Sequence, residues 1–301
     1  MIASEIAFFI DSLKLERGFS GNTCAAYARD LALFASWLEA HGRNEVSAIS
    51  RGDIAAFLSE ERERGLLSST RARRAVAIRM WLKYLKERRI IADNPAEATR
   101  PPRKSLVLPK VLDEKEVFAI IDGIDGDSPR ERRDRAMLEL LYGCGLRVSE
   151  LCALKCDEIV GDGELLRILG KGSKVRLVPV GAAAGTALSL YLHTARSAFQ
   201  GGDLSCAHVF LTRLGKPFTR QGVFKLIKER SAAAGIELSR ISPHVFRHCF
   251  ASHMLARGAD IRAIQELLGH ADIGTTQIYT HIDRERFGDM HRRYHPRAAS
   301  D

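Results

Sequence analysis

The sequence predicts a mainly α-helical protein of two domains, with one small antiparallel sheet in the second domain. Residues 1 to about 94 carry apolar side chains at helical spacing, whereas residues 94–110 contain four of the nine prolines in the chain. Residues 164–180 contain two short runs of leucine, isoleucine and valine around a glycine-rich turn, which is typical of a β-hairpin. A chain of 301 residues is long enough to bury two cores.

The first domain is predicted to be all helical. Apolar residues fall at helical spacing in four segments, 2–15, 22–41, 51–64 and 69–90, with glycine turn signals between them. The fourth segment combines a basic face with an apolar stripe, and that stripe comprises Val76, Met80, Leu82 and Leu85.

The basic face of this fourth segment has two interpretations. It is a solvated helix surface, or it lies across DNA phosphates with a threonine and several arginines as donors. The candidate DNA contacts on this segment are Thr70, Arg71, Arg73, Arg74 and Arg79. Asn22 and Thr23, at the start of the second segment, are further candidates, although helix capping alone would explain both.

The proline-rich stretch marks the expected domain boundary. We predict a helical domain over 1–94, an extended linker over 95–110 and a second domain over 111–301. Arg103 and Lys104 lie among the linker prolines, so the linker is a further candidate for contact with a nucleic-acid backbone.

Charge and composition favour a polyanionic partner and a cytoplasmic protein. The chain has 46 basic against 37 acidic side chains, a net charge of +9. No apolar run reaches the length of a membrane span, and Glu5 and Asp11 stand where a signal peptide would carry basic residues. Cys152 with Cys156, and Cys206 with His208, have ligand spacing, but neither pair completes a zinc pattern. We therefore predict no metal and no other cofactor.

The second domain begins with helix signals and then changes to a hairpin. Asp113 begins a helix, and a second helix over 130–142 ends in a loop that leads to Arg147. Arg147 and Glu150 begin the next helix, where a surface ion pair is the simplest explanation for them. Lys171 lies at the predicted hairpin tip. Further helices are predicted over 182–199, 219–234 and 283–293.

Residues 242–281 contain most of the candidate chemistry. Ser242 and Pro243 predict a helix start that places His244 and Arg247 on one face in the first turn, where the helix dipole suits an anion. A helix end is predicted at Gly258, and a second helix runs from Asp260 to Gly269. His270 follows that helix directly, and Tyr279 follows nine residues later.

Six residues together predict phosphoryl transfer at a DNA phosphodiester: Arg147, Lys171, His244, Arg247, His270 and Tyr279. Two arginines can fork onto one phosphate and stabilise the charge of its transition state. A tyrosine hydroxyl can attack phosphorus, while a lysine or histidine gives a proton to the leaving oxygen. This chemistry requires neither a metal nor ATP, which fits a sequence without a phosphate-binding glycine loop.

Four motifs resemble those of the tyrosine recombinases of the phage integrase family, most of all the bacterial chromosome-dimer recombinases of the XerC and XerD type. They are GCGLRVSELCALK around Arg147, LGKGSKVRLVPV around Lys171, HVFRHCFASHML around His244 and Arg247, and LLGHADIGTTQIYTH around His270 and Tyr279. The resemblance covers nearly the whole chain. Phe246 and Cys249 stand where leucine and serine are more usual, which changes packing and removes no reacting group.

The resemblance implies a helical SAM-like core-binding domain and an α+β catalytic domain of the tyrosine recombinase fold. It implies that Tyr279 is the nucleophile, that Arg147 and Arg247 clamp the scissile phosphate, and that Lys171 is the acid for the leaving hydroxyl. His244 and His270 would serve proton transfer and transition-state hydrogen bonding, with Glu150 supporting Arg147.

The partners are likewise implied by the resemblance. They are double-stranded DNA, a paralogous recombinase and a septal DNA translocase. The DNA would be bound by a homo- or hetero-tetramer on two sites, and the last helix around Phe287 to His295 would dock onto a neighbouring protomer. The implied role is resolution of chromosome dimers at cell division. The alternatives are the integrase of a mobile element, a type IB topoisomerase and a catalytically inactive DNA-binding protein.

Overall fold

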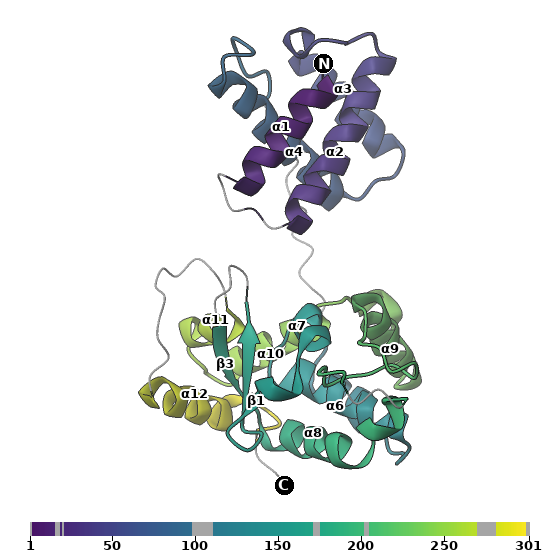
Figure 1. The fold of residues 1–301 in the computed structure, drawn as a ribbon, viewed down its shortest axis with the longest axis vertical. Helices are drawn as coiled ribbons and strands as arrows, with labels where there is room; N and C mark the ends of the chain where they lie inside the picture. The colour runs from purple at the N-terminus through teal and green to yellow at the C-terminus, as the bar shows by residue number, and fades with distance from the viewer. Residues whose placement is uncertain are drawn as a thin grey trace. The chain divides into compact units, whose positions relative to one another are not determined.

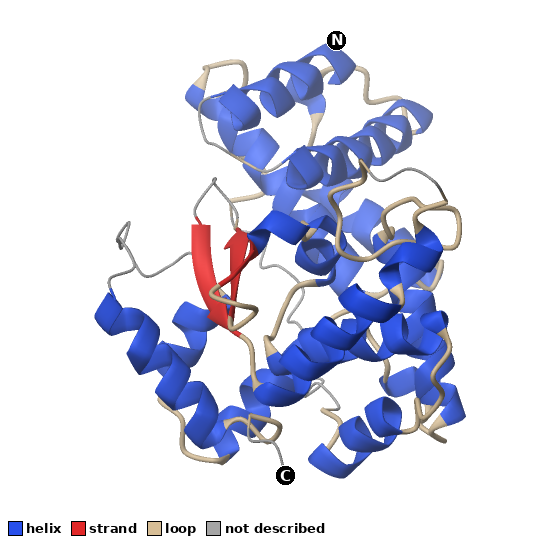
Figure 2. Cartoon of the chain, turned by 60° about the horizontal axis from the view of Figure 1, so that its bottom comes forward, coloured by secondary structure: helices blue, strands red, loops and turns tan. Residues whose placement is uncertain are grey.

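The computed structural model divides the chain into two compact units, Met1–Leu108 and Pro109–Asp301 (Figure 1). The residues it describes are 2–15, 19, 21–97, 111–170, 175–201, 205–269 and 281–298. Most of the predicted linker lies outside these ranges, so the linker bounds 95–110 stay a prediction. The mainly helical fold with one small antiparallel sheet is confirmed, as Figure 2 shows.

The first unit is a helical bundle, and its four predicted helices are confirmed. They are α1 (Ile2–Leu15), α2 (Gly21–Ala40), α3 (Arg51–Glu63) and α4 (Ser68–Glu87), with the 3₁₀ helix η1 (Val46–Ala48) before α3. A capping box begins α3, because Ser50 Oγ accepts from the Asp53 N–H and the Asp53 carboxylate accepts from the Ser50 N–H. Phe9, Phe34 and Trp81 are among the fully buried side chains of the core.

The buried face of α4 is broader than predicted. Leu82 and Leu85 are fully buried as expected, but Val76 and Met80 are only half-buried, and Ile78 and Trp81 fill the core instead. The reason is that α4 packs against α1, α2 and α3 together, so a single narrow stripe does not describe its contacts.

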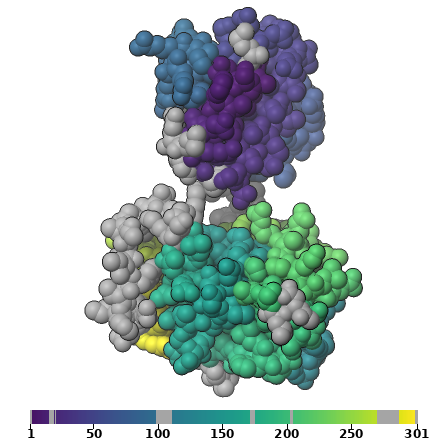
Figure 3. Space-filling view, viewed as in Figure 1, coloured from purple at the N-terminus to yellow at the C-terminus, as the bar shows by residue number. Residues whose placement is uncertain are grey.

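The second unit packs helices around a three-stranded sheet. Its helices are α5 (Glu114–Asp122), α6 (Pro129–Gly143), α7 (Val148–Ala153), α8 (Ala182–Thr194), α9 (Arg220–Ala233), α10 (Val245–Ala256), α11 (Ile261–Leu268) and α12 (His281–Tyr294). Its 3₁₀ helices are η2 (Cys156–Glu158), η4 (Arg196–Phe199) and η5 (Leu238–Arg240). In the space-filling view, segments far apart in the sequence share the surface of this unit (Figure 3).

The predicted hairpin is present, and a third strand extends it. The strands β1 (Ile159–Val160), β2 (Leu165–Leu169) and β3 (Val175–Pro179) form an antiparallel sheet in that order. Burial alternates along β2 and β3, so one face of the hairpin packs on the core. β1 was not predicted, because two residues carry no alternation that could reveal a strand.

A buried carboxylate ties α6 to α9. Asp134 has no exposed side-chain surface, and the guanidiniums of Arg133 and Arg230 donate to its two oxygens at distances down to 2.8 and 2.6 Å. Both arginines would lose their shared anion if this side chain were removed. A buried ion pair that loses one partner leaves the other charge uncompensated in a low-dielectric interior.

We expect Asp134→Ala to lower the free energy of unfolding of the second unit by about 3–5 kcal/mol. Both tryptophans, Trp37 and Trp81, lie in the first unit, so their fluorescence reports that unit while far-UV circular dichroism reports both. Urea unfolding should therefore show an early dichroism transition that fluorescence does not follow. The exposed Asp125→Ala should change stability by less than about 0.5 kcal/mol, and equal effects of the two substitutions would contradict the prediction.

The carboxyl-terminal segment packs on its own unit in this single chain. Phe287 is buried in a cluster with Phe250, and His291 Nε2 donates to the carbonyl oxygen of Gly143 at 2.6 Å. The rings of His291 and His295 stack with their centroids 4.7 Å apart. Docking of this segment onto a neighbouring protomer stays a prediction for the assembled protein.

This packing should make the second unit sensitive to acid. Burial lowers the pKa of His291 and, more strongly, that of His295, so the folded chain keeps both rings neutral where the unfolded chain protonates them. Stability should therefore be fully present above about pH 6.5 and fall by about 1.4 kcal/mol per pH unit below it for each ring that stays neutral. Melting temperatures between pH 8 and 5 test this: His295→Phe should flatten the profile, and the exposed His193→Gln should not.

Candidate active site at the carboxyl end of α11

The loop between α6 and α7 positions Arg147. Gly145 in this loop has φ +58°, and a Cβ on it would lie 2.8 Å from Phe250 Cδ1 and 2.9 Å from Leu268 Cδ2. Only glycine combines this backbone conformation with so close an approach. The loop therefore lies against α10 and α11, and Arg147 follows it as the residue that caps α7.

Glu150 accepts from Arg147 in two ways. Its Oε2 accepts from the Arg147 backbone N–H at 2.8 Å, and its Oε1 accepts from Arg147 Nη1 at 2.7 Å. The predicted pair is therefore present, but it is not a surface pair, because the Glu150 side chain is only 7% exposed. A buried carboxylate in this position restricts the orientation of the Arg147 guanidinium.

Arg247 lies in the first turn of α10, which begins later than predicted. The backbone of His244 has φ −113° and ψ 7°, so Ser242, Pro243 and His244 form a turn, and the helix begins at Val245. Ser242 Oγ accepts from the His244 N–H at 3.3 Å within this turn. His244 consequently caps α10 and is exposed, whereas Arg247 is buried. The predicted helix end at Gly258 is confirmed, since α10 ends at Ala256 and Gly258 has positive φ.

The carboxyl end of α11 brings three arginines together. Asp260 caps the start of α11, and Gly269 ends it in the left-handed conformation, both as predicted. The carbonyls of Leu267, Leu268 and Gly269 at this end then accept from one guanidinium each. Arg176 Nε donates to Leu267 O at 2.9 Å, Arg247 Nη2 donates to Leu268 O, and Arg147 Nη2 donates to Gly269 O at 3.2 Å. Cations suit this end because it carries the negative pole of the helix dipole.

Arg176 is a site residue that the sequence reasoning missed. It lies on β3, and both of its terminal nitrogens donate to Glu150, at 2.8 and 2.9 Å. A signal was available, because Arg176 shares the alternation of β3 with Val178, and both are buried. An arginine on the core face of a strand needs a buried partner, and the sequence alone did not name one.

The site carries more positive than negative charge. Among the described residues, Glu150 is the carboxylate paired with Arg147, Arg176 and Arg247, the last at 4.0 Å. Burial alone would raise the pKa of Glu150, but hydrogen bonds from Arg176 and then Arg147 lower it to about 2. Glu150 is thus a permanent anion, and three guanidiniums against one carboxylate leave a surplus.

The surplus charge perturbs the groups around it. Burial, then the charge of Arg147, lowers the pKa of Arg247 to about 10. Partial burial, then the charges of His248 and the two arginines, lowers the pKa of His244. A bound anion would relieve the repulsion at both groups. The geometry therefore suits a phosphate. The Arg147 side chain is one-third exposed, so a phosphate can reach its guanidinium from solvent.

Three of the predicted catalytic residues, Lys171, His270 and Tyr279, lie outside the described residues. Residues 171–174 connect β2 to β3, and residue 270 directly follows Gly269 at the arginine cluster. Residue 279 precedes α12 by two positions.

Two of the predicted DNA contacts on α4 have partners inside the first unit. Arg73 donates to both oxygens of the buried Asp30, at 2.7 and 3.0 Å, but its side chain remains 47% exposed. Arg74 is buried and pairs with Asp30 and Glu61. Because its charge is compensated within the core, Arg74 serves the packing of this unit, and its burial argues against contact with DNA.

The other candidate DNA contacts differ in exposure. Asn22 is exposed, while Thr23, Thr70, Arg71 and Arg79 are partly exposed. Arg71 Nε donates to Leu66 O at 3.3 Å, which fixes the start of α4. Arg103 and Lys104 lie outside the described residues. These positions stay predictions.

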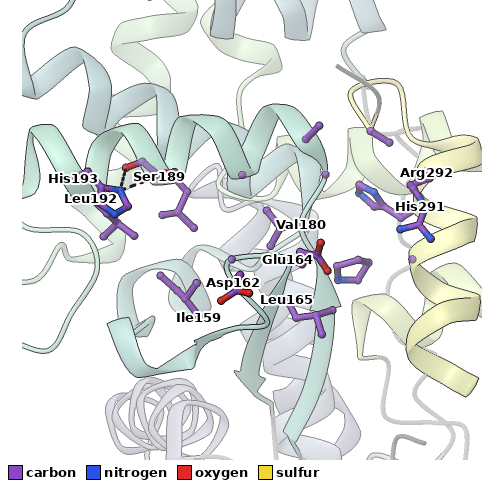
Figure 4. Close-up of a pocket in the computed structure, with 18 residues that line it drawn as sticks. Ile159, Asp162, Glu164, Leu165, Val180, Ser189, Leu192, His193, His291 and Arg292 are labelled. Carbon is purple, nitrogen blue, oxygen red and sulfur yellow. Dashed lines mark hydrogen bonds between the residues drawn. The ribbon is translucent and has the colours of Figure 1, made fainter. Parts of the chain in front are cut away.

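A cavity of about 770 Å³ lies elsewhere in the second unit, between the sheet, α8 and α12 (Figure 4). Ser189 and His193 line it from α8, and His291 and Arg292 line it from α12. No candidate catalytic residue that the structure describes lines this cavity, so the arginine cluster is a separate site. Within the described ranges, no three His, Cys, Asp or Glu side chains gather as metal ligands, and no helix is long and apolar enough to cross a membrane.

Both units of the chain match domains of a known protein family. Residues 110–286 match the Phage integrase family, and residues 6–89 match the phage integrase N-terminal SAM-like domain. The tyrosine recombinase XerD of Listeria monocytogenes serotype 4b (strain F2365) is 40% identical over 291 residues, which cover 96% of this chain and 98% of that protein.

Two solved structures share the fold. The XerH site-specific recombinase bound to palindromic difH substrate, a post-cleavage complex, has a TM-score of 0.70 and 22% identity, covering 89% of this chain and 79% of that chain. A lambda integrase tetramer bound to a Holliday junction has a TM-score of 0.69 and 20% identity, covering 91% of this chain and 75% of that one. The family match and the XerD identity together decide the classification: this chain belongs to the phage integrase family of tyrosine recombinases, enzymes that break and rejoin DNA.

Proposed function

We propose that this protein is a site-specific recombinase that cleaves DNA through a 3′-phosphotyrosyl intermediate and exchanges strands through a Holliday junction. One observation carries the proposal: Arg147 and Arg247 meet at one helix end with charge that Glu150 does not fully balance. A scissile phosphate supplies the missing negative charge, and it gains a further charge in its transition state.

The two arginines are assigned to the non-bridging oxygens of that phosphate. Arg147 approaches from the α7 cap, and Arg247 approaches from the first turn of α10. The fork of each guanidinium can give two parallel hydrogen bonds, which orient the phosphate as well as stabilise it. Glu150 supports this arrangement because its carboxylate accepts hydrogen bonds from the backbone and the guanidinium of Arg147.

The reacting groups are assigned from the motifs. The Tyr279 hydroxyl gives its proton to His244 or His270 and attacks phosphorus. The phosphotyrosyl bond forms as the bond from phosphorus to the 5′-oxygen of the next nucleotide breaks, and that oxygen leaves with a proton from Lys171. His244 and His270 serve proton transfer and hydrogen bonding to the transition state. The lowered pKa of His244 supports this role, since a neutral ring can both donate and accept.

We extend the proposal to the whole chain and its partners. Residues 1–94 form the core DNA-binding domain, 95–110 the linker and 111–301 the catalytic domain. The protein acts in the cytoplasm as a homo- or hetero-tetramer on two DNA sites, and the lambda integrase tetramer on a Holliday junction offers a precedent for this assembly within the fold. Its similarity to XerD supports resolution of chromosome dimers, with a paralogous recombinase and a septal translocase as partners.

A nicked suicide substrate tests the chemistry. DNA carrying the dimer-resolution site of the host chromosome, with a nick beside the cleavage position, should trap the protein on a 3′ end in a covalent complex. No adduct on any DNA would indicate an inactive DNA-binding protein. Recombination between two sites should exceed relaxation of a plasmid without the site, whereas relaxation alone would indicate a type IB topoisomerase. Reaction only at the ends of a mobile element would favour an integrase.

A further inference from the structure

We infer that Arg176 is a positioning residue for strand cleavage: it fixes Glu150 and the carboxyl end of α11, and through them the orientation of Arg147. This inference rests on the proposed function, because it assumes that Arg147 binds the scissile phosphate. Arg176 itself is not placed to touch DNA, since its side chain is only 6% exposed.

All three guanidinium nitrogens of Arg176 donate hydrogen bonds to acceptors within the protein. Its two terminal nitrogens donate to the two oxygens of Glu150 at 2.8 and 2.9 Å, and its Nε donates to Leu267 O at 2.9 Å. Glu150 in turn accepts from Arg147 through Oε1 and Oε2. Both carboxylate oxygens are therefore shared between one arginine that remains buried and one that reaches solvent. A rotation of Arg176 would move Glu150, and Arg147 would lose its fixed partner.

The site favours an arginine at position 176 over other basic residues. A planar fork can bind a carboxylate with two nitrogens while its third nitrogen reaches a carbonyl, and a lysine amine offers no such geometry. Gly269 fits the same side chain closely, because a Cβ on that glycine would lie 3.2 Å from Arg176 Cδ. The end of α11 and the side chain of Arg176 thus pack directly against each other.

Arg176 also connects the chain segments that lead to two further candidates. It lies on β3, which follows residues 171–174, and it bonds the end of α11, which precedes residue 270. Loss of Arg176 should therefore disturb Glu150, the end of α11 and the arginine clamp while leaving the DNA-binding surfaces intact.

The test compares Arg176→Gln and Arg176→Lys with wild type in single-turnover cleavage of the suicide substrate at saturating protein. We expect Arg176→Gln to slow cleavage roughly 100-fold, comparable to the loss of one transition-state donor, with DNA Kd within about twofold. Arg176→Lys should recover part of the rate. The matched control is Arg167→Gln, an exposed arginine on β2 of the same sheet, which should cleave at the wild-type rate.

The pH profile separates positioning from a general loss of structure. In Arg176→Gln, the buried Glu150 loses its principal partner, so its pKa should rise and the acid limb of the cleavage rate should move to higher pH. A double-mutant cycle with Glu150→Gln should be strongly non-additive, because both substitutions interrupt one network.

The outcomes are distinct. A wild-type rate and pH profile in Arg176→Gln would overturn the inference and leave the proposed function intact. A parallel decline of cleavage, DNA affinity and melting temperature would also overturn it, since that is a purely structural role. If Arg176→Gln does not fold, Arg176→Lys decides by the same criteria. Failure of the wild-type protein to form any adduct would instead remove the proposed function.

Discussion

Replacement of Tyr279 by phenylalanine is expected to abolish the covalent complex on the suicide substrate while DNA affinity stays within about twofold. The substitution removes only the attacking oxygen, so no phosphotyrosyl bond can form. We expect the cleavage rate to fall at least about 10⁴-fold, as is usual when a nucleophile is removed. Denaturing gel electrophoresis of labelled DNA measures the adduct directly.

Other tyrosines of the second unit are poor substitutes for this nucleophile. Tyr142 and Tyr191 are fully buried, and burial raises the pKa of both, that of Tyr191 to about 12. The matched control is Tyr294→Phe, a partly exposed residue of α12 that should retain the wild-type rate. A normal adduct yield from Tyr279→Phe would reject Tyr279 as the nucleophile.

Replacement of Arg247 by alanine is expected to slow cleavage by about 10³-fold or more, because the transition state loses a forked cation in a partly desolvated site. Arg247→Lys keeps the charge but loses the fork, so its rate should lie between those of alanine and wild type. Stopped-time cleavage at saturating protein isolates this effect from DNA binding.

Arg247 also has contacts within the fold, which the experiment must separate from catalysis. Its Nη1 donates to Gly145 O at 2.7 Å and its Nη2 donates to Leu268 O, so alanine leaves two carbonyls without this donor. Melting temperature and DNA affinity are therefore measured beside the rate. Arg257→Ala, an exposed arginine just after α10 that pairs with Glu114, is the control. Near-native cleavage by Arg247→Ala would rule out the proposed clamp.

Much of the local structure could be predicted because its signals lie within a few residues of each other. Asp113 begins α5 as predicted and forms a capping box with Glu116, and Asp260 and Gly269 bound α11. The hairpin followed from two short apolar runs around a glycine-rich turn. The error at His244 has the same origin, since a serine and a proline favour a helix start without fixing at which residue the helix begins.

The partners of buried charges could not be predicted in this way. Arg73 and Arg74 read as equivalent basic residues on one helix, yet Arg74 is buried against Asp30 and Glu61 while Arg73 keeps an exposed side chain. Asp30 lies 43 residues from Arg73 in the chain. No periodicity within α4 contains information about a carboxylate on α2.

The sequence itself determined the order of the motifs, the helix caps and the excess of basic residues, because each depends on residue type and short spacing. Only the tertiary structure decided that Glu150 is shared by Arg147 and Arg176, and that three arginines meet the last carbonyls of α11. Arg176 and Leu267 are 91 residues apart. Their contact depends on how β3 packs against α11. Burial opposes the charge of Glu150, but the hydrogen bonds from Arg176 and Arg147 lower its pKa and keep it an anion.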